Sequence, residues 1–257
     1  MEKILIIGAG QAGVQIAASL RQAGFEGAVA LVGAESQPPY QRPPLSKAYL
    51  QGELDMPRLF LRGPDFYEKN RIDLQLSTRV ESVDLAAGTA RLGDGRSLAF
   101  DKVAFATGAP PRRLAVPGAD LAGVHYLRTI ADSDALRPAL SAEGTVAVIG
   151  AGYIGLEVAA SARKAGRDVV VIEALDRPLA RVAGREVSDY FVDLHRRHGV
   201  KFRFGARVAG FEGKGAVAAI ALSGGELIPC AAALVGVGAV PETALAASAG
   251  LPVQNGV

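Results

Sequence analysis

The same glycine phrase occurs twice in this chain, each time directly after a short apolar run. The first copy reads IIGAGQAGVQ at positions 6–15, and the second reads VIGAGYIGLE at positions 148–157. A continuous apolar run is typical of a strand that is buried on both faces of a parallel sheet. A glycine turn that follows such a strand and opens a helix indicates a strand–helix–strand unit. The repeat therefore predicts two such units within 257 residues.

The two copies predict the same order of elements beyond their glycine phrases. Helical spacing of apolar residues ends at Gly24 in the first copy and at Gly166 in the second, and an apolar strand follows each glycine. Further along, residues 78–106 and 201–237 both read as short alternating strands joined by hairpins. We expect an α/β fold with two Rossmann-like dinucleotide-binding domains, each a parallel sheet with helices plus a small antiparallel β-meander.

Each glycine of the pattern G-x-G-x-x-G has its own physical reason. The first makes the turn from strand to helix, the second lets the backbone approach a pyrophosphate, and the third lets the helix pack closely on the strand. The N-terminus of the helix then presents unpaired N–H groups to the anion. Because both copies follow a strand and open a helix, both are expected to bind a dinucleotide.

An acid at the end of the second strand of such a unit accepts a hydrogen bond from a ribose 2′-hydroxyl. Glu173 directly follows the strand 169–172 in the second copy, whereas in the first copy the nearest acid, Glu35, comes later. The charge of Glu173 would repel a 2′-phosphate, which favours NADH over NADPH in the second copy. Arg177 and Arg181 lie close to this acid in sequence and would soften the preference.

Composition limits the classes of function. A net charge of +2, from 28 Lys and Arg against 26 Asp and Glu, gives no reason to expect binding to nucleic acid. The single cysteine, Cys230, excludes an internal disulfide, a C-x-x-C pair and a cysteine metal cluster, so we expect a cytoplasmic protein whose redox chemistry uses a bound cofactor. No apolar stretch is long enough and free enough of charge to span a membrane. We assign no metal site, because His195 and His198 lie among arginines and are typical of a solvated helix face.

Three segments carry a resemblance to a known family. They are Gln41-Arg42-Pro43-Pro44-Leu45-Ser46-Lys47, Ala106-Thr107-Gly108 and Gly152-Tyr153-Ile154-Gly155-Leu156-Glu157. With them, the chain resembles the FAD-dependent pyridine nucleotide-disulfide oxidoreductases over its whole length, and in particular the single-flavin ferredoxin and rubredoxin reductases. The resemblance implies two domains of the glutathione-reductase type, an FAD-binding domain at 1–112 and an NADH-binding domain at 113–243. It also implies that 244–257 begin a return to the FAD domain, the rest of which this chain is expected to lack.

The resemblance further implies which residues contact the two cofactors. Those expected to face FAD are Gly8, Gly10, Ala12, Gly13, Glu35, Arg42, Lys47, Val80, Ala106, Thr107, Gly108 and Arg128. Those expected to line the NADH site are Gly150, Gly152, Tyr153, Ile154, Gly155, Glu173, Arg181 and Gly238. Tyr153 is expected beside the nicotinamide, although an aromatic residue on the first turn of a helix is equally compatible with packing.

Lys47 and Glu157 are the expected catalytic pair. A hydride that arrives at the flavin leaves negative charge on the reduced ring, and a fixed ammonium group nearby stabilises that charge. In the family this lysine pairs with the glutamate of the second glycine phrase, and such a pair holds the ammonium in place and keeps it protonated. Without the resemblance, Lys47 reads as a solvated lysine in a proline-rich loop.

The implied enzyme is an FAD-dependent NADH:ferredoxin (or rubredoxin) reductase. It would pass electrons from NADH through FAD to a small iron–sulfur carrier of an oxygenase or cytochrome P450 system. Disulfide reduction is not expected, because Leu45-Ser46-Lys47 offers no cysteine near the flavin. Two alternatives remain open: a flavin module of the monodehydroascorbate or nitrite reductase type, and a redox-sensing interaction protein of the apoptosis-inducing-factor type. The sequence indicates no oligomeric state.

Overall fold

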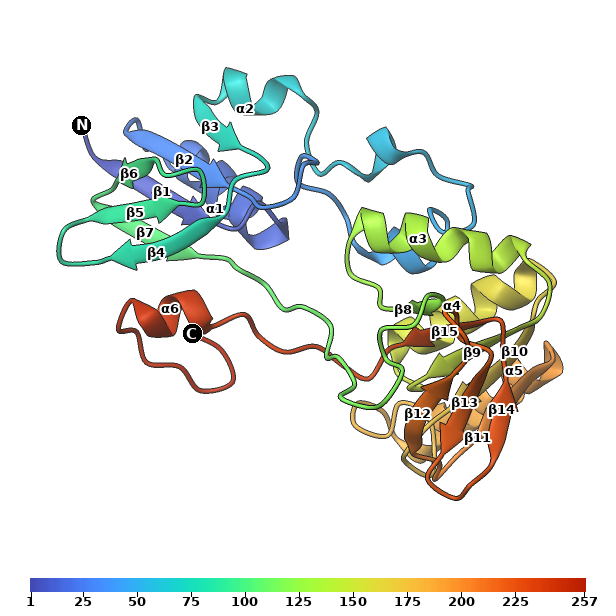
Figure 1. Ribbon diagram of the computed structural model, residues 1–257. Helices are drawn as coiled ribbons and strands as arrows, with labels where there is room; N and C mark the ends of the chain where they lie inside the picture. Colours follow the sequence, from blue (N-terminus) through green and yellow to red (C-terminus); the bar gives the residue numbers. More distant parts are fainter. The chain divides into compact units, whose positions relative to one another are not determined.

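Both glycine phrases lie at strand-to-helix turns in the computed structural model, which describes residues 1–257 (Figure 1). The chain forms two compact units. The first consists of residues 1–41, 56–110 and 240–257, and the second consists of residues 42–55 and 111–239. Each unit contains one glycine phrase together with its own parallel sheet and its own antiparallel sheet.

The first unit contains a four-stranded parallel sheet with the strand order β3-β2-β1-β7 and a three-stranded antiparallel sheet with the order β4-β5-β6. Its strands are β1 (Lys3–Ile7), β2 (Ala28–Val32), β3 (Ile72–Gln75), β4 (Val80–Asp84), β5 (Thr89–Leu92), β6 (Ser97–Ala99) and β7 (Lys102–Phe105). Its helices are α1 (Gln11–Gln22), α2 (Asp65–Lys69) and α6 (Ala244–Ser248), with a 3-10 helix η2 (Met56–Leu59).

The second unit repeats this arrangement, with the parallel order β11-β10-β9-β15-β8 and the antiparallel order β12-β13-β14. Its strands are β8 (Val124–His125), β9 (Thr145–Ile149), β10 (Asp168–Ile172), β11 (Val200–Arg203), β12 (Val208–Glu212), β13 (Ala219–Leu222), β14 (Leu227–Pro229) and β15 (Ala232–Val235). Its helices are α3 (Ile130–Ser141), α4 (Tyr153–Lys164) and α5 (Arg185–Arg197), with a 3-10 helix η1 (Pro43–Ser46). The strands β9, β10, β11 and β15 take the places of β1, β2, β3 and β7, so the predicted duplication and the predicted fold class are confirmed.

The helices that follow the two glycine phrases end in the same way. After α1, Gly24 has a positive φ of 79° and its N–H donates to Arg21, while the next N–H donates to Leu20. After α4, Gly166 has a φ of 80° and the corresponding bonds reach Arg163 and Ala162. This pair of bonds is the Schellman motif, which glycine permits because it has no Cβ to clash in the left-handed conformation. The capping glycines predicted from the sequence therefore end both helices.

Successive side chains of the parallel strands point to opposite faces of the sheet, and this creates two separate cores in the first unit. Ile6 packs with Val14 and Ala17 of α1, whereas Leu5 and Ile7 pack on the opposite face with residues of the antiparallel sheet. This follows from the strand period of two, which sends successive side chains to opposite faces. Each fully buried Leu or Ile contributes about 1.5–3 kcal/mol to the free energy of folding.

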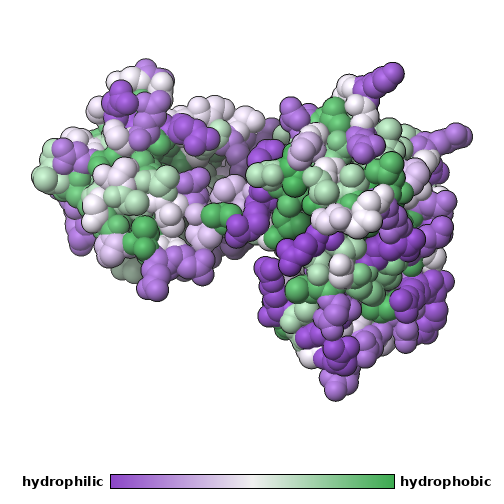
Figure 2. Space-filling view, turned by 60° about the horizontal axis from the view of Figure 1, so that its bottom comes forward, coloured by the Kyte–Doolittle hydropathy of each residue, from purple (hydrophilic) through white to green (hydrophobic).

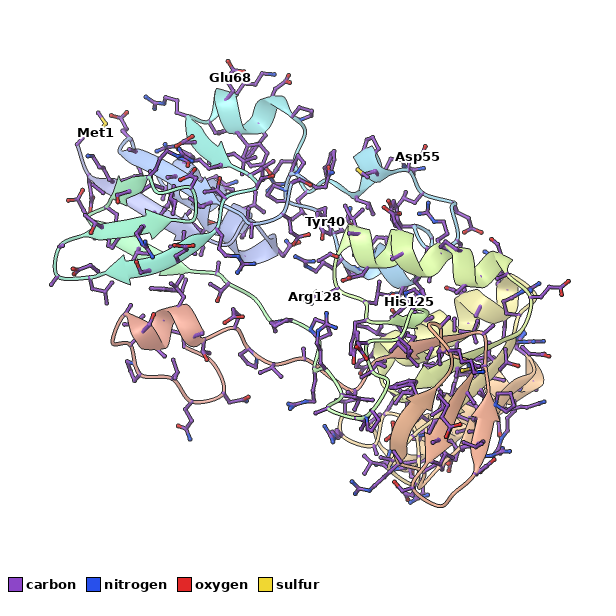
Figure 3. All side chains as sticks on the ribbon, in the orientation of Figure 1. Met1, Tyr40, Asp55, Glu68, His125 and Arg128 are labelled. Carbon is purple, nitrogen blue, oxygen red and sulfur yellow. The ribbon has the colours of Figure 1, made fainter.

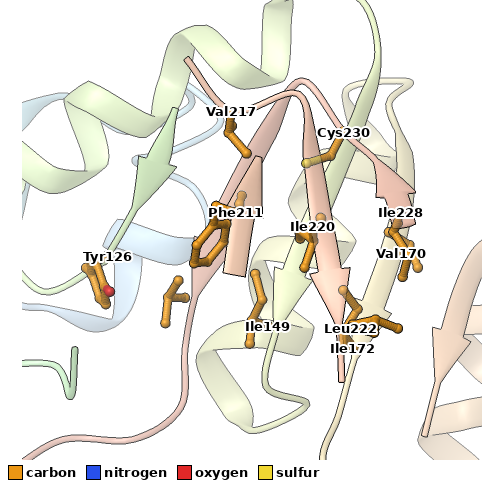
Figure 4. Close-up of a cluster of buried hydrophobic side chains, with 13 residues drawn as sticks. Tyr126, Ile149, Val170, Ile172, Phe211, Val217, Ile220, Leu222, Ile228 and Cys230 are labelled. Carbon is orange, nitrogen blue, oxygen red and sulfur yellow. The ribbon is translucent and has the colours of Figure 1, made fainter. Parts of the chain in front are cut away.

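The second unit has the same layering, and Figure 4 shows its core between the parallel sheet and the antiparallel sheet. The buried residues that meet there include Ile149, Val170, Ile172, Phe211, Ile220, Leu222 and Ile228. The prediction of a solvated helix face is wrong for His195 of α5, which is buried near the rings of Phe191 and Phe202. Burial lowers the pKa of His195, which therefore behaves as a neutral packing residue at pH 7.

Segment 42–55 packs on the second unit, although the resemblance places it within the first domain. The buried hydroxyl groups of Ser133 (α3) and Ser161 (α4) donate to the carbonyl oxygens of Leu45 and Ser46 at 2.9 and 2.8 Å. A buried backbone carbonyl is costly to leave unpaired, so these two serines fix the segment. The sequence carried no signal for this placement, because a serine inside a helix is usually read as a surface residue.

Residues 240–257 lie in the first unit. The hydroxyl of Thr107 donates to the carbonyl oxygen of Glu242 at 2.6 Å, and the N–H of Glu242 donates to Gly108 at 2.9 Å. Beyond them, Leu245 and Ala249 pack against the core that faces the antiparallel sheet. The Ala106-Thr107-Gly108 motif is thus tied to the last segment of the chain.

The surface of the protein is mixed in polarity. On the face that Figure 2 draws, hydrophilic residues are interspersed with smaller hydrophobic areas on both units. Among the helices of this structure, none has both the length and the apolar character that crossing a membrane requires.

Cys230 is expected to be unreactive in the folded protein. It is 7% exposed, and burial raises the pKa of its thiol to about 11. Since the thiolate is the nucleophile and this thiol stays protonated below that pH, iodoacetamide at pH 8 should leave the native protein unmodified. Mass spectrometry checks this, with the same reagent on the urea-unfolded protein as the control. Alkylation of native and unfolded protein at equal rates would contradict the prediction.

Candidate functional site

The first and third glycines of each phrase are in steric contact. Gly8 and Gly150 turn the chain with positive φ angles of 116° and 98°. A Cβ on Gly13 would lie 1.9 Å from the carbonyl oxygen of Gly8, and a Cβ on Gly155 would lie 2.0 Å from that of Gly150. No side chain fits at either position, so the helix can pack on the strand only with glycine there.

The second glycine of each phrase has the opposite environment. A Cβ on Gly10 or on Gly152 would meet no atom within 4 Å. Both residues are the N-caps of their helices, and neither helix has a side chain that caps its N-terminus. The first N–H groups of α1 and α4 are therefore left for a ligand, in the manner of a pyrophosphate site.

A cavity of about 620 Å³ opens above the second glycine phrase, within the second unit. It lies at the carboxyl ends of β9, β10 and β15, where ligands bind in open α/β sheets. Seven of the eight residues predicted at the NADH site line it, namely Gly150, Gly152, Tyr153, Ile154, Glu173, Arg181 and Gly238. The eighth, Gly155, lies in the helix–strand contact described above. The volume lies within the range of a small-molecule or cofactor site.

Charged groups around the cavity favour an anionic ligand. Three arginines line it, Arg128, Arg181 and Arg207, against the single acid Glu173. Arg128 lies on the segment that leads from β8 into α3 (Figure 3), so the structure places it at this cavity, whereas the resemblance assigns it to FAD. Arg207 was not singled out from the sequence, because an exposed arginine between two strands carries no motif. Arg177 does not line the cavity.

Glu173 is held by backbone donors. Its carboxylate accepts hydrogen bonds from the N–H of Ala151 at 2.7 Å and from the N–H of Leu175 at 2.9 Å. Ala151 is the middle residue of the glycine turn, so the strand-end acid and the turn are joined directly. A carboxylate oxygen accepts more than one hydrogen bond, which leaves it able to receive a ribose hydroxyl as well.

In the first unit the position equivalent to Glu173 is Gly33. The N–H and carbonyl of Gly33 bond to Gln75 and Thr78, as those of Glu173 bond to Arg203 and Ala206. A Cβ on Gly33 would lie 2.5 Å from the Cβ of Ala9, so an acid cannot stand there without a shift of the backbone.

Glu35, the acid predicted for the first unit, lies two residues after Gly33. The carboxylate of Glu35 accepts a hydrogen bond from the hydroxyl of Tyr40, which is buried. This contact holds the side chain of Glu35 on the first unit, where the sequence predicted the ribose acid.

Lys47 and Glu157 form an ion pair at 2.7 Å, both within the second unit. Their side chains are 46% and 30% exposed, so solvent screens the pair and its contribution to stability is small. The other carboxylate oxygen of Glu157 accepts a hydrogen bond of 2.5 Å from the hydroxyl of Ser46. Ser46 is buried, and no sequence pattern distinguished it from the other residues of its motif. The arrangement determines geometry more than stability, because Ser46 and Lys47 together fix the carboxylate of Glu157.

The remaining residues predicted at FAD are divided between the units. Arg42 lies in the second unit, where its guanidinium donates to the carbonyl of Arg128 at 2.6 Å. Ala12 is exposed on the first turn of α1, and Val80 is buried in the core beside the antiparallel sheet. Ala106 lies at the glycine turn, since its carbonyl oxygen would be 2.1 Å from a Cβ on Gly8.

Comparison with known proteins identifies close relatives. A family model described as pyridine nucleotide-disulphide oxidoreductase matches residues 2–257. Rhodocoxin reductase from Rhodococcus erythropolis is 46% identical over 255 residues, which cover 99% of this chain and 60% of the relative. Putidaredoxin reductase from Pseudomonas putida is 40% identical, with 100% of this chain and 62% of the relative covered. The chain therefore spans about three fifths of the length of these relatives.

Two solved structures share the fold over the whole chain. The crystal structure of the covalent putidaredoxin reductase–putidaredoxin complex matches with a TM-score of 0.96 and 40% identity, covering 100% of this chain and 63% of that chain. A ferredoxin reductase from Rhodopseudomonas palustris matches with a TM-score of 0.97 and 43% identity, covering 100% and 64%.

Alanine at the third glycine of the second phrase should reduce stability, whereas alanine at the second glycine should weaken ligand binding. Gly155→Ala should lower the free energy of unfolding by about 1–3 kcal/mol, because its Cβ overpacks the turn. Gly152→Ala should change it by less than about 1 kcal/mol but weaken ADP-ribose binding about tenfold or more, because its Cβ enters the space above the helix N-terminus. Urea unfolding and calorimetric titration measure the two quantities. Equal losses of stability in both variants would show that the turn is not packed as described.

Proposed function

Because this chain belongs to the pyridine nucleotide-disulphide oxidoreductase family, we propose that it forms the nucleotide-binding units of an FAD-dependent NADH:ferredoxin or NADH:rubredoxin reductase. The reaction would oxidise NADH and reduce a small iron–sulfur carrier of an oxygenase or cytochrome P450 system. The reductases reported above, which are named for rhodocoxin, putidaredoxin and ferredoxin, support the assignment of the acceptor class.

The observation that carries the proposal is the occurrence of two glycine turns of one geometry in a single chain. In each, the third glycine contacts the first, and the second glycine leaves the helix N-terminus open. One such turn holds one pyrophosphate. Electron transfer between two dinucleotides requires two of them, which this duplication supplies.

The first unit fits FAD, and the second fits NADH. Around the first turn, the open space at Gly10 and the uncapped N-terminus of α1 suit a pyrophosphate, and Glu35 suits a ribose. We assign FAD to the residues of this unit that the resemblance implies, which are Gly8, Gly10, Ala12, Gly13, Glu35, Val80, Ala106, Thr107 and Gly108. The assignment of Arg42 and Lys47 to FAD rests on the resemblance alone. We assign NADH to the cavity of the second unit, where Glu173 disfavours a 2′-phosphate. When bound, FAD supplies the chemistry that accepts an electron pair from NADH and releases the electrons singly.

In this proposal, Lys47 supplies a fixed positive charge. Its ammonium is held at 2.7 Å by Glu157, which is itself held by Ser46. A preorganised cation stabilises negative charge that develops nearby during reduction without having to reorient at that moment. Glu157 acts through Lys47 and is a positioning residue, together with Ser46.

Disulfide exchange by this chain has no support, despite the name of the family. Its one cysteine is buried in the core of the second unit, and the pKa of that thiol is raised to about 11. Exchange needs a thiolate with access to its target. The single cysteine also supports a cytoplasmic, reducing location as part of the proposal.

Anaerobic stopped-flow mixing of the intact protein tests the function. With FAD bound, NADH should reduce the protein rapidly, and a second mixing should show reduction of [2Fe–2S] ferredoxins or rubredoxin far faster than free reduced FAD achieves. Absorbance of the flavin and of the carrier reports the two steps separately. Reduction by NADH followed by no transfer to any carrier would contradict the acceptor class, and absence of reduction by NADH would contradict the enzyme as a whole.

Replacement of Lys47 should separate chemistry from binding. Lys47→Met should slow flavin reduction at saturating NADH on the order of 10- to 100-fold, because a preorganised charge is lost, and should change the NADH dissociation constant much less. Lys164→Met is the matched control, since Lys164 is an exposed lysine of the same unit that pairs with Glu53 at 2.5 Å and lines no part of the NADH cavity. Equal reduction rates for the Lys47 variant and the control would exclude the proposed role.

A further inference from the structure

Residues 174–184 form a loop that makes one wall of the cavity. The loop follows β10 and precedes α5, and its residues Leu175, Leu179, Ala180 and Arg181 line the cavity. A loop of this length has many alternative conformations, so an ordered wall requires specific contacts. Three of those contacts come from Arg177, which does not line the cavity.

The guanidinium of Arg177 bonds to three oxygens of this region. One nitrogen, Nη1, donates to the carbonyl of Ala183 at 2.9 Å and to the hydroxyl of Ser188 at 2.6 Å, and Nη2 donates to the carbonyl of Ala180 at 3.2 Å. The side chain thus spans the loop from its middle to its end. These three bonds all reach protein oxygens, and Arg177 does not line the cavity.

Ser188, on the first turn of α5, completes this contact. It has no exposed surface, and its hydroxyl donates to the carbonyl of Pro178 at 2.6 Å while accepting from Arg177. Through the two side chains, the carbonyl groups of residues 178, 180 and 183 are all satisfied. We call Arg177 and Ser188 the loop brace.

The conformation that the brace holds is one that the loop would not keep alone. Leu179 has a φ of 54°, in the left-handed region that a leucine rarely adopts and that persists only where the surroundings impose it. In that conformation its N–H donates to the carbonyl of Ala151 at 3.0 Å. The wall is therefore joined to the glycine turn at Leu179, and Arg181 follows two residues later at the cavity.

We propose that Arg177 is a positioning residue of the nucleotide site, which with Ser188 holds the loop in the shape that places Arg181 and Leu179 against the ligand. The inference rests on the proposed function, because it takes the cavity to be the NADH site. It also separates two arginines that lie four positions apart in sequence: Arg181 faces the ligand, and Arg177 acts only through the loop.

The geometry requires arginine, not merely a positive charge. A guanidinium is a planar fork that serves several acceptors at fixed directions, whereas a lysine ammonium is a single point at the end of a flexible chain. Arg177→Lys keeps the charge but cannot satisfy the oxygens of Ala180, Ala183 and Ser188 together. Arg185→Ala is the converse control, since it removes a charge from the same region, where Arg185 pairs with Asp176 on the surface, and leaves the brace intact.

The test is calorimetric titration of ADP-ribose into the intact FAD-containing protein. The temperature is kept below the unfolding midpoint of every variant. Arg177→Lys should raise the dissociation constant about tenfold, and Arg185→Ala should leave it within about twofold. Ser188→Ala, which removes one partner of the guanidinium with little change of volume, should raise it in the same direction. Hydrogen exchange adds a local readout: the amides of Leu179 and Ala183 should lose protection in the Arg177 and Ser188 variants, while those of β10 keep it.

The outcomes divide cleanly. Unchanged affinity in both brace variants, with the wild-type protein binding ADP-ribose, would overturn the inference and leave the proposed function standing. If Arg185→Ala binds ADP-ribose more weakly while Arg177→Lys binds it as tightly as the wild type, simple charge attraction would explain the result. That outcome would also overturn the inference. Absence of ADP-ribose binding by the wild-type protein would contradict the proposed function and the inference with it.

Discussion

The fold of each unit depends on one steric contact, the approach of the third glycine of the phrase to the carbonyl of the first. At both turns, an added Cβ would lie within 2.0 Å of that oxygen. The absence of a side chain lets α1 pack on β1 and α4 on β9 so closely that the helix begins directly at the strand end. The open N-terminus, the cavity and the tie to the strand-end acid all require this helix position. The same contact appears twice, which explains why the two phrases are so alike.

In the second unit, the peptide groups of Ala151 connect the parts of the site. The N–H bonds to Glu173 and the carbonyl accepts from Leu179, so the turn, the acid and the loop wall are joined at one residue. A shift of the turn, the acid or the loop wall therefore displaces the other two. This connection is why Arg177, which does not line the cavity, is relevant to the ligand. The backbone of one turn residue thus supports both the acid and the loop that line the cavity.

The sequence predicted the duplication, the order of strand, turn and helix, and the helix ends at Gly24 and Gly166, because these depend on local patterns with a physical cause. It also brought together seven residues that line one cavity. It did not predict that segment 42–55 packs on the second unit, since that depends on two buried serine hydroxyls in distant helices. The local pattern treated Arg177 and Arg181 alike, because the direction of a side chain in a loop is set by tertiary contacts that leave no periodic signal. Only the resemblance assigned Arg181, and not Arg177, to the NADH site.

The two units differ at the position of Gly33 and Glu173 for a steric reason. The backbone bonds of Gly33 match those of Glu173, but a Cβ on Gly33 would be 2.5 Å from the Cβ of Ala9. If the two units descend from one ancestral module, their divergence at this position cannot be reversed by a single substitution, because restoring an acid also requires the turn to move. Steric exclusion at this one glycine would then keep the strand-end acid at different positions in the two units.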